Sequence, residues 1–171
     1  VTLGTRATQG IPAEAGGTEG YDGQFVYFIA HDPISAPFFI ARGGDIPEYR
    51  FQRILLPIFG RGLALGNESL IPFTLLAVNL VALWASSIAL ERLLVGFGVS
   101  RWYILGYALT IAIFGTVRLS LPEVLAYGLV VGGIFMMHHD RWLWGAWLFG
   151  LAAISKETTL VFVGGYALWM L

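Results

Sequence analysis

The sequence predicts an all-α protein: a polytopic transmembrane helix bundle with an N-terminal outer loop that contains interfacial helices. Two observations predict this class. Hydrophobic residues make up 57% of the 171-residue chain and charged residues only 12%, whereas soluble domains are nearer half apolar and a quarter charged. From Leu70 onward the chain is a succession of apolar runs separated by short polar segments, which is the pattern of successive membrane spans.

The charge and cysteine content exclude several kinds of function. The formal net charge is -1, which argues against nucleic acid as a partner, because nucleic acid binding needs a basic face. The chain has no cysteine, so disulfides, thiolate nucleophiles and cysteine metal sites are excluded. The polar, glycine-rich residues 1–20 lack the basic segment and apolar core of a signal peptide.

The first domain predicted is the mixed region 1–69, which holds most of the prolines and charged residues and is expected to form part of a first outer loop. Its most apolar stretch, 54–65, contains Pro57, Gly60 and Arg61. This stretch is too short to cross a hydrocarbon layer of about 30 Å, so we expect an interfacial or re-entrant helix. If it did cross, the polar residues discussed below would divide between two membrane faces.

The second domain predicted, 70–171, is a transmembrane bundle of about five helices that is truncated at its C-terminus. The last apolar run stops at Leu171, before it reaches the roughly 20 residues that a span needs. The chain is therefore expected to be a fragment of a longer protein. The runs that predict the helices are 70–90, 102–117, 124–137, 142–154 and 158–171.

The short loops between these runs predict an orientation. We name the end with loops 92–101 and 138–141 side A, and the end with loops 118–123 and 156–157 side B. Side A carries three arginines, whereas side B carries one arginine and one lysine. Because cytoplasmic loops are enriched in Lys and Arg, side A is predicted to be cytoplasmic and side B to be the outer, periplasmic face. Region 1–69 is then expected on side B.

Asp22 is the first candidate for chemistry. It lies between Tyr21 and Gly23, directly before an aromatic-rich helical pattern. At a helix start, the helix dipole and the free N–H groups keep a carboxylate ionised. Two interpretations follow: an ordinary N-cap, or a general base that takes a proton from an acceptor hydroxyl.

Arg50 and Arg53 are the second candidates. They are three residues apart, so on one helix they share a face. Two guanidinium groups at the headgroup level suit a phosphate or pyrophosphate, since each donates a bidentate fork. The alternative is that both side chains extend to the phosphates of bulk lipid.

Two further segments place a cation and an acid at the same end of neighbouring helices. They contain Arg118 with Glu123, and Lys156 with Glu157. Ionisable residues in or near membrane spans are costly and are therefore candidates for function. The alternative is an ordinary interfacial loop.

The remaining polar residues favour structural roles. Asn79 lies within an apolar run, where hydrogen bonding between helices explains it. Adjacent His138 and His139 point to different faces of a helix, and no further ligand is available on that side. The sequence therefore predicts no metal site.

Three stretches taken together resemble a known group of proteins. They are YDGQF (21–25), YRFQRILLP (49–57) and KET (156–158). In this combination the chain, from about Gly20 to Leu171, resembles bacterial multi-spanning proteins linked to cell-surface glycopolymer formation. That group is similar to the GT-C superfamily of membrane glycosyltransferases.

The resemblance implies an enzyme of the bacterial inner (plasma) membrane that transfers a sugar from a polyprenyl-phosphate donor to a cell-envelope glycan or lipid acceptor. In the superfamily, a large outer loop follows the first transmembrane helix and carries an acidic catalytic base. Asp22 matches that acid. Arg50, Arg53 and Lys156 match positions where basic residues hold the donor phosphate. The residues assigned to substrate binding are Tyr21, Gln24, Arg50, Arg53, Arg118, Glu123, Lys156 and Glu157.

Two features depart from the superfamily. The first transmembrane helix has no counterpart in the chain and is expected to precede it in the longer protein. The paired acids of many members are missing, since Asp22 has Tyr21 and Gly23 as neighbours. No cofactor is therefore expected, and a divalent metal is not indicated.

The partners implied are membrane lipid, the polyprenyl-phosphate-linked sugar and a glycan acceptor. Two other functions compete with the transferase. A transporter or flippase component for lipid-linked glycans would place its charges at mid-membrane on broken helices. A non-catalytic membrane subunit of a glycopolymer assembly system would use its glycines to pack partner helices.

Overall fold

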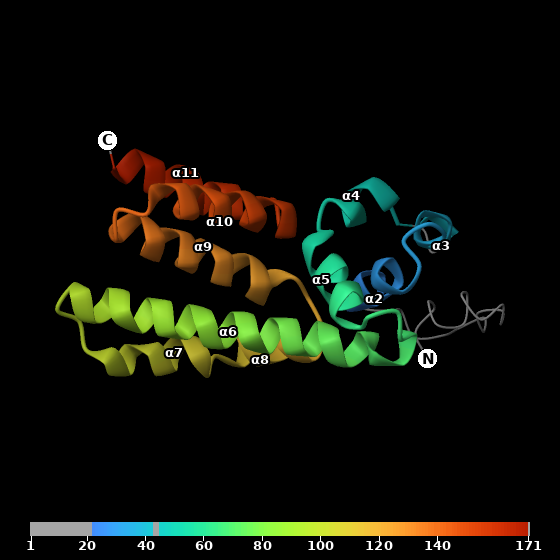
Figure 1. Ribbon diagram of the computed structural model, residues 1–171, viewed down its shortest axis with the longest axis horizontal. Helices are drawn as coiled ribbons and strands as arrows, with labels where there is room; N and C mark the ends of the chain where they lie inside the picture. Colours follow the sequence, from blue (N-terminus) through green and yellow to red (C-terminus); the bar gives the residue numbers. More distant parts are fainter. Residues whose placement is uncertain (1–21, 43–44, 171) are drawn as a thin grey trace.

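The computed structural model describes residues 22–42 and 45–170, and in these ranges every regular element is a helix (Figure 1). The predicted all-α class is thus confirmed for the part of the chain described. The elements are α2 (Gly23–His31), α3 (Ala36–Arg42), α4 (Pro47–Phe51), α5 (Leu55–Leu63), the 3-10 turn η1 (Glu68–Leu70), α6 (Ile71–Gly96), η2 (Arg101–Tyr103), α7 (Ile104–Ala108), α8 (Ile111–Arg118), α9 (Glu123–His138), α10 (Trp142–Ser155) and α11 (Thr159–Trp169).

The helices from α6 onward run back and forth along one axis (Figure 1). α7 and α8 return along α6, and α9, α10 and α11 then alternate in direction on its other side. The short helices α2 to α5 gather at the end where α6 begins. This is side B, because the loops that join α8 to α9 and α10 to α11 lie at the same end.

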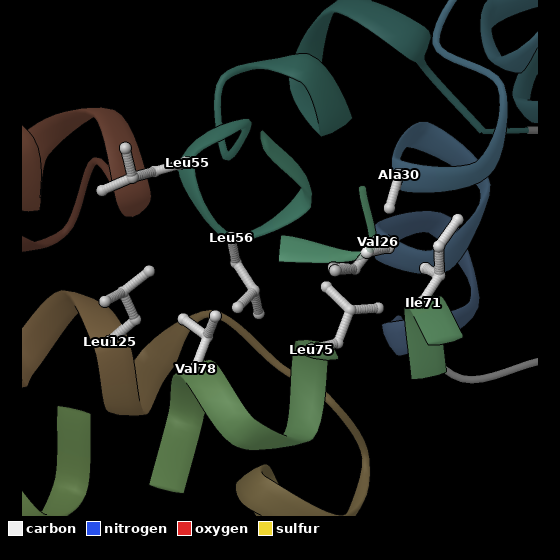
Figure 2. Close-up of a cluster of buried hydrophobic side chains, with 9 residues drawn as sticks. Val26, Ala30, Leu55, Leu56, Ile71, Leu75, Val78 and Leu125 are labelled. Carbon is white, nitrogen blue, oxygen red and sulfur yellow. The ribbon is translucent and has the colours of Figure 1, made fainter. Parts of the chain in front are cut away.

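A cluster of buried hydrophobic side chains packs the short helices α2 and α5 against the longer helices α6 and α9 (Figure 2). α5 contributes Leu55 and Leu56, and Leu56 is completely buried. Leu75 of α6 packs against α5 at Gly60, whose carbonyl accepts a hydrogen bond of 2.7 Å from Thr74. Burying a leucine stabilises a fold by about 2 kcal/mol. The rest of the cluster comes from α2, α6, α9 and the residue that follows α5: Val26, Ala30, Ile71, Val78, Leu125 and Ala64.

The stretch 54–65 forms the nine-residue helix α5. At 1.5 Å per residue this helix is about 14 Å long, less than half of a hydrocarbon layer. It therefore cannot cross a membrane by itself. Its exposed side includes Ile58, Phe59 and Leu63, which are 52%, 39% and 59% exposed.

One helix of the described residues, Glu68–Gly96, is long and apolar enough to span a membrane, with 29 residues. A second span would need the pair Ala112–Arg118 and Glu123–His138, which is bent by 119°. The later apolar runs form helices, but α10 has 14 residues and α11 has 11. Most of the predicted runs are thus helical but shorter than a span of about 20 residues.

The expectation of one helix over the run 102–117 is wrong, because the chain leaves the helix at Leu109 and Thr110, between α7 and α8. The hydroxyl of Thr110 donates to the carbonyl of Gly106. In an α-helix that carbonyl would accept from the amide of Thr110, so the side chain replaces the backbone donor. Thr110 then adopts an extended backbone, with φ -62° and ψ 130°.

Glycines allow α9 and α10 to pack closely. A Cβ added at Gly145 of α10 would lie 3.0 Å from the carbonyl oxygen of Gly133 and 2.7 Å from Met137. A Cβ added at Gly133 would overlap the ring of Phe149. Close backbone approach at small residues is a common way for apolar helices to associate.

Replacing Gly145 with alanine should therefore destabilise the protein by about 1–3 kcal/mol through overpacking. Gly150→Ala is the matched control on the same helix, because a Cβ there meets no atom within 4 Å. Thermal unfolding of the full-length protein in detergent measures the effect. Equal melting temperatures for the two variants would contradict the packing argument.

Candidate functional site

Charged residues from four parts of the chain converge at side B. They come from the start of α2, from the segment 45–53 around α4, from the start of α9, and from the loop that precedes α11. Their side chains form ion pairs between segments that are distant in the sequence. We call this group the side-B cluster, and its members are Asp22, Asp45, Arg50, Arg53, Glu123, Lys156 and Glu157.

Arg50 binds two carboxylates. Its Nε and Nη2 donate to Asp45 at 2.7 and 2.5 Å, and Nη2 lies 3.1 Å from Oδ1 of Asp22. The guanidinium also stacks 4.4 Å from the ring centre of Phe25. Burial lowers the pKa of Arg50, but hydrogen bonds to Asp22 and Asp45 outweigh it and raise the pKa overall. Arg50 is thus a fixed positive charge that the two carboxylates hold in place.

Asp22 takes the predicted N-cap position of α2, but its side chain makes no capping hydrogen bond. The N-cap position is confirmed, but the side-chain hydrogen bond of an ordinary N-cap is absent. The carboxylate turns instead toward Arg50, and the Asp22 side chain is 57% exposed. A solvent-accessible carboxylate beside a fixed cation is placed to accept a proton from a bound hydroxyl.

Arg53 does not share a helix face with Arg50, because α4 ends at Phe51 and Arg53 lies in the following turn. The predicted geometry is wrong on this point. Both guanidinium groups nevertheless face the ring of Tyr49, at 5.5 Å for Arg50 and 4.5 Å for Arg53.

Arg53 pairs with Glu157, 104 positions along the chain. Nη2 donates to Oε1 at 2.7 Å and Nε to Oε2 at 3.2 Å. The hydrogen bond from Arg53 lowers the pKa of Glu157 from its ordinary value of 4.5. A lowered pKa means that the pair stabilises the fold at neutral pH, and that this contribution is lost only below about pH 4.5. The pair joins the turn after α4 to the loop before α11.

Lys156 and Glu123 form a third pair, with 2.5 Å between Nζ and Oε1. Their side chains are only 14% and 22% exposed. The second oxygen of Glu123 is buried without a hydrogen-bond partner among the described residues. Glu123 begins α9, where the helix dipole favours a negative charge.

Two buried polar residues fix the loop that leads into α9 and Glu123. Nδ2 of Asn79 donates to the carbonyl of Leu121 at 3.0 Å, and the hydroxyl of Ser155 donates to the carbonyl of Pro122 at 3.5 Å. Asn79 and Ser155 are both fully buried. The sequence interpretation of Asn79 as a helix–helix bond is therefore wrong, since it holds a loop. Ser155 was not predicted, because a lone serine at a helix end carries no distinctive signal.

Four members of the side-B cluster, Asp22, Arg50, Arg53 and Glu123, line a small cavity. Its volume is about 20 Å³, room for about one water molecule. An apolar wall from α2 faces charged groups from the other segments. The lining residues are Asp22, Phe25, Val26, Ile29, Arg50, Arg53, Leu121, Pro122 and Glu123.

Two predicted site residues stand apart from the cluster, and a third is not among the residues that the structure describes. Arg118 is exposed at side B, and no carboxylate of the described ranges pairs with it. Gln24 is buried, does not line the cavity, and its Oε1 has no partner within the described structure. Tyr21 lies outside the described residues. Asp45, which sequence analysis missed, belongs to the cluster instead.

Within residues 22–42 and 45–170, no group of three or more His, Cys, Asp or Glu is placed to hold a metal ion. His138 packs on Phe97, with ring centres 5.2 Å apart, and Nδ1 of His139 lies 2.8 Å from the carbonyl of Phe135.

Comparison with known proteins adds no assignment: no family model, curated protein or solved structure matches the chain.

Proposed function

We propose that this chain is part of an integral glycosyltransferase of the bacterial inner membrane, which transfers a sugar from a polyprenyl-phosphate donor to a glycan or lipid acceptor of the cell envelope. One observation carries the proposal. An accessible carboxylate, Asp22, borders a cavity that two guanidinium groups, Arg50 and Arg53, also line. The resemblance to the GT-C superfamily implies the same arrangement, with a catalytic base beside cations that bind the donor phosphate.

The surface of the long helices supports membrane insertion. Large apolar side chains face outward, including Trp84 of α6, Trp147 of α10 and Phe162 of α11, which are 67%, 69% and 54% exposed. Soluble monomers rarely expose contiguous apolar surfaces of this kind. Short helices such as α10 fit a bilayer that thins locally. In the proposed orientation, side B faces the periplasm.

The chemistry assigns a role to each group. Asp22 accepts the proton of the acceptor hydroxyl, whose oxygen forms a bond to the anomeric carbon of the donor sugar. The bond from that carbon to the phosphate oxygen breaks, and polyprenyl phosphate leaves with the electron pair. Arg50 and Arg53 stabilise the negative charge on the leaving phosphate.

Donor binding requires that the donor phosphate replace a carboxylate on a guanidinium of the site. A cavity of about 20 Å³ is too small for a sugar phosphate, and Arg50 and Arg53 are both occupied by acids. A phosphate offers a guanidinium the same bidentate contacts as a carboxylate. Asp45 keeps Arg50 in place while the phosphate displaces Asp22, and this displacement frees Asp22 to act as the base.

The break between α7 and α8 favours a second function, a transporter or flippase for lipid-linked glycans. Broken helices in a membrane commonly form substrate sites. The break at Leu109 and Thr110 lies within the apolar run 102–117, which contains no ionisable side chain except two tyrosines. The charged groups lie instead in the side-B cluster, so the transferase is the better-supported function.

Product formation in detergent distinguishes the two functions, because a detergent micelle has no second compartment. We expect the purified full-length protein to transfer sugar from a polyprenyl-phosphate sugar to acceptor, and to leave a nucleotide sugar unused. Failure of transfer in detergent, together with movement of lipid-linked glycan across the bilayer of reconstituted vesicles, would establish the transporter instead.

A further inference from the structure

An apolar cleft opens between α6 and α9, away from the side-B cluster. Its volume is about 330 Å³. Small residues of α6 and α9 line part of it, together with larger apolar side chains that include Leu148 of α10. Representative lining residues are Ala82, Ala85 and Ala89 of α6 with Gly128 and Gly132 of α9.

The cleft exists because the two helices touch and then diverge. At Gly128 a Cβ would lie 3.2 Å from the carbonyl oxygen of Ala82, so the backbones are close at this point. One turn further toward side A, a Cβ at Gly132 would find Leu148 and no atom of α6 within 4 Å. Beyond the cleft, Phe97 and His138 bring the helices together again, with ring centres 5.2 Å apart. The two helices therefore diverge around Gly132 and come together again at their side A ends.

Arg92 is the one charged side chain among the described residues that line the cleft. It is exposed, and no carboxylate of the described chain lies within ion-pair distance of it. Its neighbour Glu91 faces Arg101 instead, at 3.8 Å. In the proposed orientation, Arg92 lies at the headgroup level of the side A leaflet, where a guanidinium favours phosphate.

We propose that this cleft binds an acyl chain of an anionic glycerophospholipid from the side A leaflet, with the lipid phosphate on Arg92. Water is disfavoured against apolar walls, and an empty cleft forfeits dispersion contacts. A lipid is favoured over a partner helix because the apolar walls end at a guanidinium, which matches an acyl chain joined to a phosphate. The inference rests on membrane insertion and not on the transferase chemistry.

Photo-crosslinking tests the proposal on the full-length protein in bilayer nanodiscs. The probes are phosphatidylglycerol and phosphatidylcholine, each with the same diazirine acyl chain and mapped by mass spectrometry. We expect crosslinks to concentrate on cleft residues such as Phe135, Met136 and Leu148, with phosphatidylglycerol several-fold more efficient. Arg92→Gln should reduce that preference to less than twofold. Arg101→Gln, an exposed change outside the cleft, should leave it unchanged.

Three results would overturn the proposal. Crosslinks spread evenly over the apolar surface would mean that the cleft holds no lipid. A preference that survives Arg92→Gln would remove Arg92 as the phosphate ligand. Crosslinks that join two proteins through the cleft would identify a partner helix as the occupant. Asp22→Asn should leave the lipid crosslinks unchanged, so failure of the transferase proposal is distinguishable from failure of this one.

Discussion

Replacement of Asp22 with asparagine should lower the turnover of sugar transfer by about a hundredfold or more, the usual loss when a general base is removed. Asparagine keeps the size of the side chain but cannot accept the proton. The fold should persist, because Asp22 is 57% exposed and Arg50 keeps its two hydrogen bonds to Asp45. The measurement is the initial rate of transfer in detergent, at saturating donor and acceptor.

Asp45→Asn is the matched control, since it removes a second carboxylate from the same guanidinium. Asp45 does not line the cavity, so this change should weaken donor binding and leave turnover within about tenfold, the scale of one lost hydrogen bond to a charged group. Equal losses of turnover in the two variants would mean that both acids act only by positioning Arg50. Full activity of Asp22→Asn would remove Asp22 from the mechanism.

Much of the arrangement at side B could be predicted from the order of the apolar runs. Successive runs that reverse direction bring every second loop to the same end, so Glu123 and Lys156 were expected near each other. They form an ion pair in the structure. The expectation that the N-terminal region lies on side B depends on the stretch 54–65 being too short to cross a membrane. The structure agrees on its length, because the helix in this stretch, α5, has only nine residues.

The pairing within the cluster could not be predicted. Helical periodicity placed Arg50 and Arg53 on one face, but it contains no information on where α4 ends. The partner of Arg53 is Glu157, 104 positions away, and local sequence does not specify a contact at that separation. For the same reason Asp45 was missed, because its bond to Arg50 depends on the turn that precedes α4.

The break between α7 and α8 was missed for a different physical reason. Hydropathy counts apolar side chains and treats Thr110 as a weakly polar residue within a span. The hydroxyl of Thr110 instead competes with its own amide for the carbonyl of Gly106. Threonines occur often in apolar helices, so the sequence alone does not show which of them will displace a backbone hydrogen bond in this way.

Replacement of Lys156 with methionine should produce the largest loss of stability among single changes in the side-B cluster. It leaves the carboxylate of Glu123 mostly buried, with one oxygen that already lacks a partner among the described residues. Breaking a fully buried ion pair costs 3–5 kcal/mol, and partial exposure of both groups reduces the expected loss to about 1–3 kcal/mol. Thermal unfolding in detergent at neutral pH measures it.

A double-mutant cycle isolates the cause of this loss. Glu123→Gln in the Lys156→Met background removes the uncompensated charge and should restore most of the lost stability, because an apolar and a neutral side chain need no counter-ion. Glu123→Gln alone should cost less than Lys156→Met, since the lysine amine can extend to solvent on its flexible stem. If the double variant is no more stable than Lys156→Met, the pair does not couple α9 to the α10–α11 loop. In that case Asn79 and Ser155, which bind the carbonyls of Leu121 and Pro122, hold Glu123 at the cavity without it.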